Sequence, residues 1–182
     1  MKLDAKALRD LSEEDIKPKL ASLKKNPIYF ILEDVYDTYN IGGQFRLADA
    51  LSVSGLYLCG GTEKPPNSRI AKASVGTYKV VPWIYKKTAK EAILELRKKE
   101  PNIQIIAVEQ DEKAIDYRKI EYSFPLALVM GHETTGVCPE TLALVDQIAE
   151  ITMWGVNKSL NVIVSAAIVG YFASLSLPVL KQ

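Results

Sequence analysis

The sequence predicts an α/β protein with a mainly parallel sheet flanked by helices on both faces. Short, almost wholly apolar runs such as residues 28–32 and 126–130 alternate along the chain with helical patterns such as residues 88–99. Continuously apolar strands are typical of parallel sheets, because both faces of such sheets are buried. The chain has 182 residues, of which 48% are hydrophobic and 25% charged, so it fits one domain with a single sizeable core.

The predicted elements divide the chain into a short extension and one main domain. Residues 1–27 are predicted to form an amino-terminal helical extension, interrupted by Pro18 and ended by Pro27, and residues 28–182 form the main domain. The predicted strands are residues 28–32, 56–59, 80–84, 103–108, 126–130 and 147–151. The predicted helices are residues 44–51, 88–99 and an apolar stretch from Ser159 onward, and residues 60–69 are predicted as a loop.

Composition argues against several classes of protein. Cys59 and Cys138 lack the paired spacing of metal ligands and there is one histidine, so no metal site is expected. Few cysteines and an amino terminus unlike a signal peptide favour a cytoplasmic protein. Residues 159–180 are uncharged and long enough to cross a bilayer. Because this stretch contains several serines and Pro178, a helix buried in the core or in an oligomer interface is favoured over a membrane span.

The net charge of +1 hides an uneven distribution. Residues 61–99 hold ten basic and three acidic side chains, so this stretch carries +7 and the rest of the chain −6. A basic stretch on an otherwise acidic protein fits a localised contact with a polyanion. It also fits a solvated face of the amphipathic helix predicted at residues 88–99, and charge alone leaves both interpretations open.

Three polar loops follow predicted strands at the carboxyl edge of the sheet, where ligands bind in such folds. The first contains Asn40, Gly42, Gly43 and Arg46. Asn40 is expected to cap a helix, the glycines to leave its first amides uncovered, and Arg46 to reach back over them. This arrangement predicts a pocket for an anion such as phosphate. The alternative is a capped helix with an arginine on its surface.

The second loop follows the strand at residues 126–130 and runs from Gly131 to Gly136. Its glycines permit a tight turn and a close approach to a ligand, and Pro139 then begins a short helix. Glu133 is expected at the carboxyl end of the strand, where it holds a ligand or is simply a solvated turn residue. His132 is a possible general base, but neighbouring side chains of an extended segment alternate in direction, so His132 is interpreted as structural or peripheral.

The third loop runs from Ile151 to Asn161. Ser159 is expected to cap the long apolar helix, and Asn161 to lie in its first turn, near unpaired amides that suit a ligand. A plain capping sequence explains Ser159 fully and Asn161 less well. None of the three loops matches the dinucleotide fingerprint or the phosphate-binding loop.

Taken in this order, the three loops resemble the SpoU/TrmH family of SPOUT RNA methyltransferases. The matching residues are Asn40, Gly42 and Arg46 in the first motif, Gly131, Glu133 and Gly136 in the second, and Met153, Gly155, Ser159, Leu160 and Asn161 in the third. The resemblance covers roughly residues 28–175. The departures are Thr152 in place of the family's usual proline, His132 in place of a frequent asparagine, and Ile163 and Ser165 in a run of small residues.

The resemblance implies an α/β knot, in which the carboxyl-terminal segment is threaded through a loop to form a trefoil knot. It implies S-adenosyl-L-methionine as cofactor, a ribose 2′-hydroxyl of tRNA or rRNA as methyl acceptor, and a homodimer formed through the final helix. The implied cofactor-binding residues are Val108, Gly131, Ile151, Met153, Ser159 and Leu160. The implied catalytic or substrate-holding residues are Arg46, Glu133, Ser159 and Asn161, with Asn40 supporting Arg46.

The resemblance also implies a chemical role for Arg46. Arginine keeps its proton at physiological pH, so Arg46 is expected to bind the adjoining phosphate and stabilise developing alkoxide charge rather than act as the base. One alternative is a different small-ligand α/β enzyme, such as a nucleotide-binding hydrolase, but the sequence lacks phosphate-loop and metal-carboxylate signatures. The other is a non-catalytic RNA-binding or assembly protein on the same fold. Such a protein would tolerate the loss of Arg46, Glu133 or Asn161, and this chain keeps all three.

Overall fold

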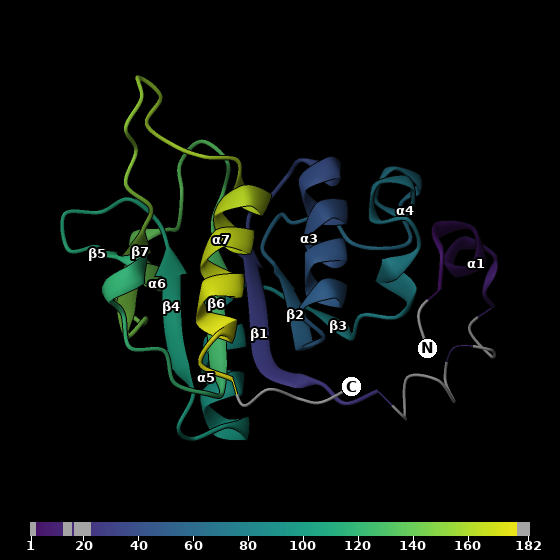
Figure 1. The fold of residues 1–182 in the computed structure, drawn as a ribbon, viewed down its shortest axis with the longest axis horizontal. Helices are drawn as coiled ribbons and strands as arrows, with labels where there is room; N and C mark the ends of the chain where they lie inside the picture. The colour runs from purple at the N-terminus through teal and green to yellow at the C-terminus, as the bar shows by residue number, and fades with distance from the viewer. Residues whose placement is uncertain (1–2, 13–15, 17–22, 178–182) are drawn as a thin grey trace.

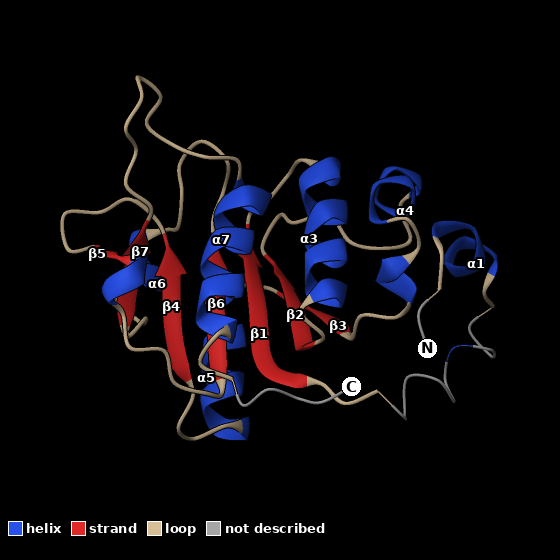
Figure 2. Cartoon of the chain, in the orientation of Figure 1, coloured by secondary structure: helices blue, strands red, loops and turns tan. Residues whose placement is uncertain are grey.

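The computed structural model describes residues 3–12, 16 and 23–177. In this part of the chain, seven strands form one sheet in the order β3-β2-β1-β6-β4-β7-β5, and every pair of neighbouring strands is parallel (Figure 2). The predicted parallel α/β sheet is therefore confirmed. The strands are β1 (Asn26–Glu33), β2 (Val53–Cys59), β3 (Trp83–Lys86), β4 (Gln104–Val108), β5 (Ile115–Asp116), β6 (Leu126–Met130) and β7 (Gln147–Glu150).

Helices cover both faces of the sheet. Figure 1 shows α3 (Thr38–Ala50) and α7 (Val162–Ser174) side by side on one face, and α4 (Ser68–Ser74) packs against α3 there. The opposite face carries α5 (Ala89–Lys99), which contacts α6 (Pro139–Leu142). The molecule thus has three layers, with the sheet in the middle.

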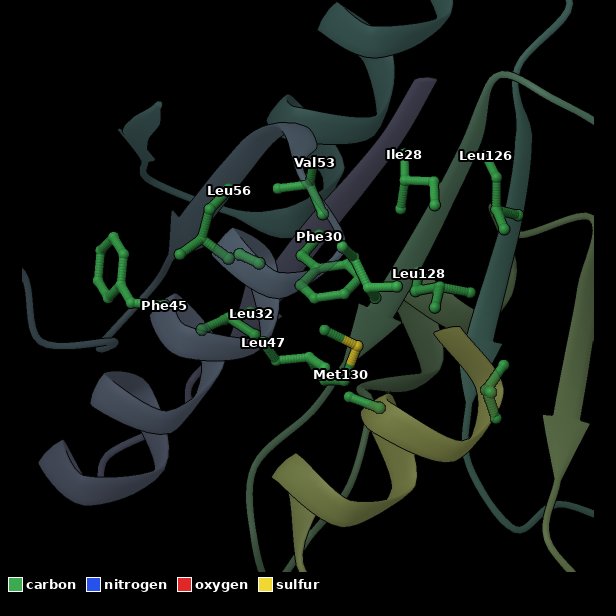
Figure 3. Packing of buried hydrophobic residues seen from close by; sticks show 14 of the residues in the cluster. Ile28, Phe30, Leu32, Phe45, Leu47, Val53, Leu56, Leu126, Leu128 and Met130 are labelled. Atoms are coloured by element: carbon green, nitrogen blue, oxygen red, sulfur yellow. The ribbon is translucent and has the colours of Figure 1, made fainter. Parts of the chain in front are cut away.

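The two faces of the central strands form two separate hydrophobic cores. Successive side chains of a strand point to opposite faces, so Phe30 and Leu128 pack toward α3 and α7 (Figure 3). Ile31 and Val129 pack toward α5. All four side chains are fully buried. This two-sided burial explains why the strands are apolar without alternation.

Several predicted boundaries were wrong. The strand predicted at residues 80–84 lies at Trp83–Lys86, and the helix predicted at residues 44–51 begins six residues earlier, at Thr38. Helix α4 (Ser68–Ser74) and strand β5 (Ile115–Asp116) were not predicted. Both are too short to show a clear hydrophobic period.

The amino-terminal extension is helical over α1 (Ala5–Asp10). Pro18 lies outside the described residues. Pro27 was predicted to end the extension, but it is the second residue of β1. A proline is compatible with this position because the first residues of a strand do not all donate to the ladder.

Gly42 and Gly43 allow neighbouring helices to approach α3, which corrects the prediction that they expose amides. A Cβ atom on Gly42 would lie 2.4 Å from the Cβ of Ala73 and 2.9 Å from the backbone nitrogen of Ser74, both in α4. A Cβ atom on Gly43 would lie 2.3 Å from the end of the Ile163 side chain in α7. These glycines bring α4 and α7 against the helix that carries Arg46.

We predict unequal effects for alanine at these two positions. Gly42→Ala should destabilise the protein by about 1–3 kcal/mol, because the clash at α4 involves backbone and cannot be relieved locally. Gly43→Ala should be close to neutral, because the Ile163 side chain can rotate away and alanine favours the helix by about 0.5–1 kcal/mol. Urea unfolding of both variants checks this. Equal destabilisation would contradict the assigned contacts.

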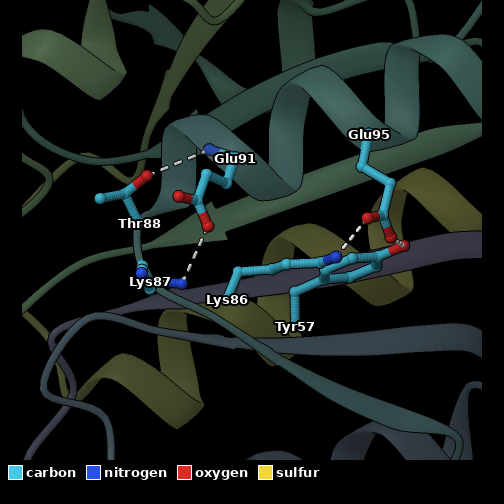
Figure 4. A network of polar contacts seen from close by, with 6 residues as sticks. All are labelled: Tyr57, Lys86, Lys87, Thr88, Glu91 and Glu95. Carbon is cyan, nitrogen blue, oxygen red and sulfur yellow. Dashed lines mark hydrogen bonds and ion pairs between the residues drawn. The ribbon is translucent and has the colours of Figure 1, made fainter.

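The basic stretch at residues 61–99 does not form one patch. It includes α4 on one face of the sheet and α5 on the other. Three of its cations form side-chain hydrogen bonds or ion pairs with other described residues: Lys79 with the carbonyls of Arg9 and Leu11, Lys86 with Glu95 (Figure 4), and Arg97 with Asp146. Part of this charge therefore stabilises the fold, and both interpretations of the basic stretch stay open.

The final apolar helix begins at Val162 rather than at Ser159. No helix among the described residues is both long enough and apolar enough to span a membrane. Ala166, Val169 and Ala173 of α7 are fully buried against the sheet. The threading of the carboxyl-terminal segment into a trefoil knot stays a prediction.

Candidate ligand site

A cavity of about 470 Å³ opens beyond the carboxyl ends of β4, β6 and β7. Val108, Gly131 and Ile151 line it at the ends of these three strands. Its position is the one expected for ligands of a parallel sheet. Its volume is within the range of small-molecule sites, about 300–1,000 Å³.

A chain of hydrogen bonds joins the three predicted motifs at this cavity. Asn161 Nδ2 donates to Asn40 Oδ1 over 2.9 Å, and Asn40 Nδ2 donates to Glu133 Oε1 over 3.0 Å. The Glu133 carboxylate also accepts from the backbone N–H groups of Asp37 at 3.1 Å and Tyr36 at 3.3 Å. Three segments that are distant in the sequence are therefore held together by their polar side chains.

The helix caps differ from those predicted. Asp37, not Asn40, caps α3, because its carboxylate accepts from the backbone N–H of Tyr39 over 2.7 Å. Asn161, not Ser159, caps α7, because its side-chain oxygen accepts from the backbone N–H of Ile163 over 2.8 Å. Asn161 thus lies just before the helix rather than in its first turn. Capping leaves its amide nitrogen free to hold Asn40.

The predicted anion pocket at the start of α3 is not formed as expected. The carboxylates of Asp37 and Glu133 already accept from the backbone N–H groups of Tyr36, Asp37 and Tyr39 there. Arg46 is exposed and does not line the cavity, and no hydrogen bond or ion pair joins it to any of the described residues. It lies one turn beyond both Gly42, which meets α4, and Gly43, which meets α7, so its position on α3 is between these two contacts.

The hydrogen bonds around Glu133 change its acidity. Partial burial by itself would raise the pKa of Glu133, but the hydrogen bonds from Asn40, Asp37 and Tyr36 outweigh it and lower the pKa from its ordinary value of 4.5. The carboxylate is therefore charged at neutral pH and stabilises the start of α3.

This lowered pKa predicts a pH dependence of stability. A carboxylate whose pKa is lower in the folded state stabilises the protein fully above its unfolded pKa, and this contribution is lost as the pH falls through the folded pKa. The free energy of unfolding of the wild type should exceed that of Glu133→Gln by a constant amount above pH 4.5, and the difference should shrink below that pH. Chemical denaturation from pH 7 to 3 measures it. A difference that grows toward low pH would contradict the lowered pKa.

The six residues predicted to bind a cofactor all line the cavity: Val108, Gly131, Ile151, Met153, Ser159 and Leu160. Four of the five predicted catalytic residues also line it: Asn40, Glu133, Ser159 and Asn161. Arg46 is the exception. Gly131 is required by the backbone, since a Cβ atom there would lie 2.2 Å from the carbonyl carbon of Gly136.

The charged side chains that line the cavity are acidic. Among the described residues, Asp37, Glu109 and Glu133 are its charged lining groups, and no lysine or arginine lines it. Carboxylates without a cationic partner attract a cationic ligand and repel an anionic one. No group of three or more histidine, cysteine or acidic side chains suited to hold a metal ion occurs in the described part of the chain.

His132 has a structural environment. Its Nδ1 atom accepts from the backbone N–H groups of Thr134 at 2.9 Å and Thr135 at 3.2 Å. The Nδ1 lone pair is therefore occupied, and in a neutral imidazole the other nitrogen carries the proton. This arrangement favours the interpretation that His132 shapes the turn rather than removing a proton from a substrate.

Glu109 is a cavity residue that the sequence analysis missed. It follows β4, and its Oε2 atom accepts from the backbone N–H of Val137 over 3.0 Å, which holds the loop after β6. The signal was available, because the rule that ligands bind beyond strand ends applies to the loop after Val108 as much as to the other three.

The parallel sheet and the cavity at its carboxyl edge define a ligand-binding α/β protein, and comparison with known proteins identifies the family. The sequence profile of the SpoU rRNA Methylase family matches residues 27–171. The chain belongs to this family.

Two similar proteins support the same assignment. The tRNA (guanosine(18)-2′-O)-methyltransferase of Escherichia coli (strain K12) is 34% identical over 145 residues, which are 78% of this chain and 60% of that protein. The enzyme of the same name from Thermus thermophilus is 32% identical over 140 residues, 76% of this chain and 70% of that protein. The chain thus spans about 60% of the length of the Escherichia coli relative.

Solved structures share the fold. The AdoMet-bound rRNA methyltransferase from Sinorhizobium meliloti superposes with a TM-score of 0.77 and 28% identity, covering 94% of this chain and 61% of that chain. The TrmH/SpoU tRNA modifying enzyme of A. aeolicus gives a TM-score of 0.75 and 25% identity, covering 94% of this chain and 81% of that chain.

Proposed function

We propose that the protein is an S-adenosylmethionine-dependent RNA methyltransferase that methylates a ribose 2′-hydroxyl. The observation that carries this proposal is the cavity at the carboxyl ends of β4, β6 and β7. Its volume suits a small ligand, and its lining carboxylates suit a positively charged one. S-adenosylmethionine supplies an electrophilic methyl group on a sulfonium cation, and the named relatives are 2′-O-methyltransferases.

The cavity residues divide into apolar and polar groups. Val108, Ile151, Met153 and Leu160 line the cavity with apolar side chains that suit the adenine ring. Gly131 also lines the cavity, and because glycine has no side chain, it contributes backbone atoms to the lining. These contacts bind and orient the cofactor, while Glu133 with the other lining carboxylates stabilises positive charge.

The acceptor ribose is placed at the α3–α7 side of the cavity. Asn40, Ser159 and Asn161 border it there, and Arg46 lies on α3, one turn beyond the glycine that meets α7. Arg46 has no ion-pair partner among the described residues, so it is available to bind an RNA phosphate and to stabilise the developing alkoxide. Asn40 and Asn161 hold the segments in register, which keeps the hydroxyl oxygen in line with the methyl carbon.

Methylation of RNA by the protein tests this function. The protein is incubated with total RNA and methyl-labelled S-adenosylmethionine, the RNA is digested to nucleosides, and the products are separated. We expect label in a 2′-O-methylnucleoside, with tRNA favoured over rRNA. Absence of label from every RNA fraction would overturn the enzymatic proposal and favour a non-catalytic RNA-binding role.

We further propose that α7 forms a homodimer interface. Val164 is 46% exposed, Tyr171 51% and Leu175 78%, and the half-buried Ile168 completes an apolar stripe at helical spacing. The opposite side of α7 is buried against the sheet. A stripe of this kind on a helix that already packs its other side fits a second copy of the same helix.

A charge in this stripe should dissociate the dimer. Tyr171→Glu is expected to give monomers in light scattering at micromolar concentration, because it buries an unpaired charge in the interface. Leu94→Glu is the matched control, since Leu94 is 45% exposed on α5, on the other face of the sheet. A dimeric Tyr171→Glu variant, or a wild-type monomer, would contradict this interface.

A further inference from the structure

A second cavity, of about 340 Å³, lies beside the first one. His132 and Gly136 line both cavities, so the turn after β6 is the wall between them. The second cavity is bordered by the segment that follows β1, where Asp34 and Tyr36 line it. None of the roles proposed above uses it.

Tyr36 presents an aromatic ring to this cavity. The ring is fixed on two sides. It makes an edge-to-face contact with the His132 ring, with the centroids 5.1 Å apart and the planes at 79°, and a Cβ atom on Gly61 would lie 2.3 Å from a ring carbon of Tyr36. The residue is nevertheless 52% exposed. A fixed, half-exposed aromatic ring is a stacking surface for a nucleobase.

Asp34 presents a carboxylate oxygen that is free among the described residues. Its Oδ1 atom accepts from the backbone N–H of Gly61 over 2.7 Å, whereas no hydrogen bond joins its Oδ2 atom to the described part of the chain. The backbone of Asp34 has a φ of 54°, an uncommon conformation for a residue other than glycine. The other carboxylate of the cavity, Glu33, is occupied by Cys138 and Thr141.

The chemistry of this cavity selects the base of a nucleotide rather than its phosphate. Of the residues that the structure describes, two carboxylates and no lysine or arginine line it, so an anionic group is disfavoured. A carboxylate accepts hydrogen bonds from N–H groups, and guanine presents two adjacent N–H donors on its Watson–Crick edge. The base is attached to the ribose carbon next to the one that bears the 2′-hydroxyl, so the two groups must occupy neighbouring spaces.

We propose that the second cavity receives the unstacked base of the nucleotide that is methylated, with Tyr36 stacking on the base and Asp34 Oδ2 accepting from guanine. This proposal rests on the proposed function, because it assigns a substrate subsite to the same centre. Enzymes that modify a base take it out of the stack and read its Watson–Crick edge in a pocket, and the second cavity would hold the base in the same way.

Binding of two short RNAs tests the subsite without catalysis. The probes are fluorescein-labelled UUGUU and the same pentamer with inosine in place of guanosine, since inosine lacks the exocyclic amino group. We expect the wild type to bind the guanosine pentamer roughly tenfold more tightly in fluorescence anisotropy, because inosine lacks the amino group that donates a hydrogen bond to the charged Asp34 Oδ2 atom. Equal affinities for the two RNAs, or no measurable binding, would overturn the subsite.

Two variants assign the discrimination to Asp34 and the stacking to Tyr36. Asp34→Asn keeps an oxygen for the Gly61 N–H and tolerates a positive φ, so the protein should fold and the guanosine preference should fall to about one. Tyr36→Leu should weaken both RNAs by roughly tenfold, and Tyr36→Phe should not. Tyr39→Leu is the control, because Tyr39 is 59% exposed but does not line this cavity.

The outcomes of this experiment separate the two proposals. Retention of the wild-type preference by Asp34→Asn, or unchanged binding by Tyr36→Leu, overturns the subsite even if the wild type methylates RNA. Failure of the wild type to methylate any RNA overturns the proposed function, whereas the pentamer affinities still decide what the second cavity binds.

Discussion

Replacing Arg46 with alanine is expected to lower methyl transfer to RNA by about 10²–10³-fold while changing the affinity for S-adenosylmethionine by less than about twofold. The reason is positional: Arg46 is exposed on α3 and does not line the cavity that is assigned to the cofactor. Single-turnover assays with labelled cofactor and calorimetry of cofactor binding measure the two quantities on the same preparation.

Arg46→Lys distinguishes charge from geometry. Lysine keeps the positive charge but loses the planar, bidentate group that matches a phosphate. We therefore expect it to restore part of the activity that alanine removes. Wild-type turnover in Arg46→Ala would refute the role of Arg46, and loss of cofactor binding would place the guanidinium in the cofactor cavity instead.

Replacing Glu133 with alanine is expected to damage both stability and activity. The change removes the acceptor for the backbone N–H groups of Tyr36 and Asp37 and for the Asn40 amide. We expect a loss of about 1–2 kcal/mol in the free energy of unfolding, since solvent can satisfy part of what is lost. Methyl transfer should fall by at least about 100-fold, because Asn40, which holds Asn161, loses its anchor.

Glu133→Gln is the matched variant for this prediction. Its side-chain oxygen can still accept hydrogen bonds, so it should lose clearly less stability than Glu133→Ala at neutral pH. Urea unfolding and the labelled-cofactor assay provide the two readouts. Unchanged stability and turnover in Glu133→Ala would show that this hydrogen-bonded chain does not organise the site.

The sheet was predictable from the sequence because strands that are buried on both faces form continuous apolar runs. Strands such as Leu126–Met130 are apolar at every position, and their carboxyl ends point to the loops that line the cavity. The individual residues of the site could not be identified from such patterns alone. Their order along the chain and their resemblance to a known family selected them.

Local capping preferences could not predict which polar residue caps each helix and which one contacts another segment. Asp37 and Asn40 are both good capping residues, and sequence alone gives no reason to prefer Asp37. The choice depends on Glu133, which is 93 residues from Asn40 and engages its amide. The predicted cap of α7 was wrong for a similar reason, because Asn161 and not Ser159 caps the helix and also reaches Asn40.

Contacts between helices could not be predicted from a single sequence either. Gly42 and Gly43 were interpreted as ligand-facing because glycine near a helix start often lies beside an anion. Their actual neighbours, Ala73 and Ile163, lie in helices that are far away in the sequence. Helix α4 (Ser68–Ser74) follows a segment rich in turn-forming residues, and this segment led to the prediction of a loop at residues 60–69.

Calorimetry of S-adenosylmethionine binding tests the central claim most directly, since everything else depends on a cofactor in the cavity beyond β4, β6 and β7. We expect one cofactor to bind per chain of the wild type. Leu160→Lys should abolish binding by placing a cation in the cavity, whereas Leu94→Lys, on the opposite face of the sheet, should not. Absence of heat at millimolar cofactor, or unchanged binding by Leu160→Lys, would contradict the assignment.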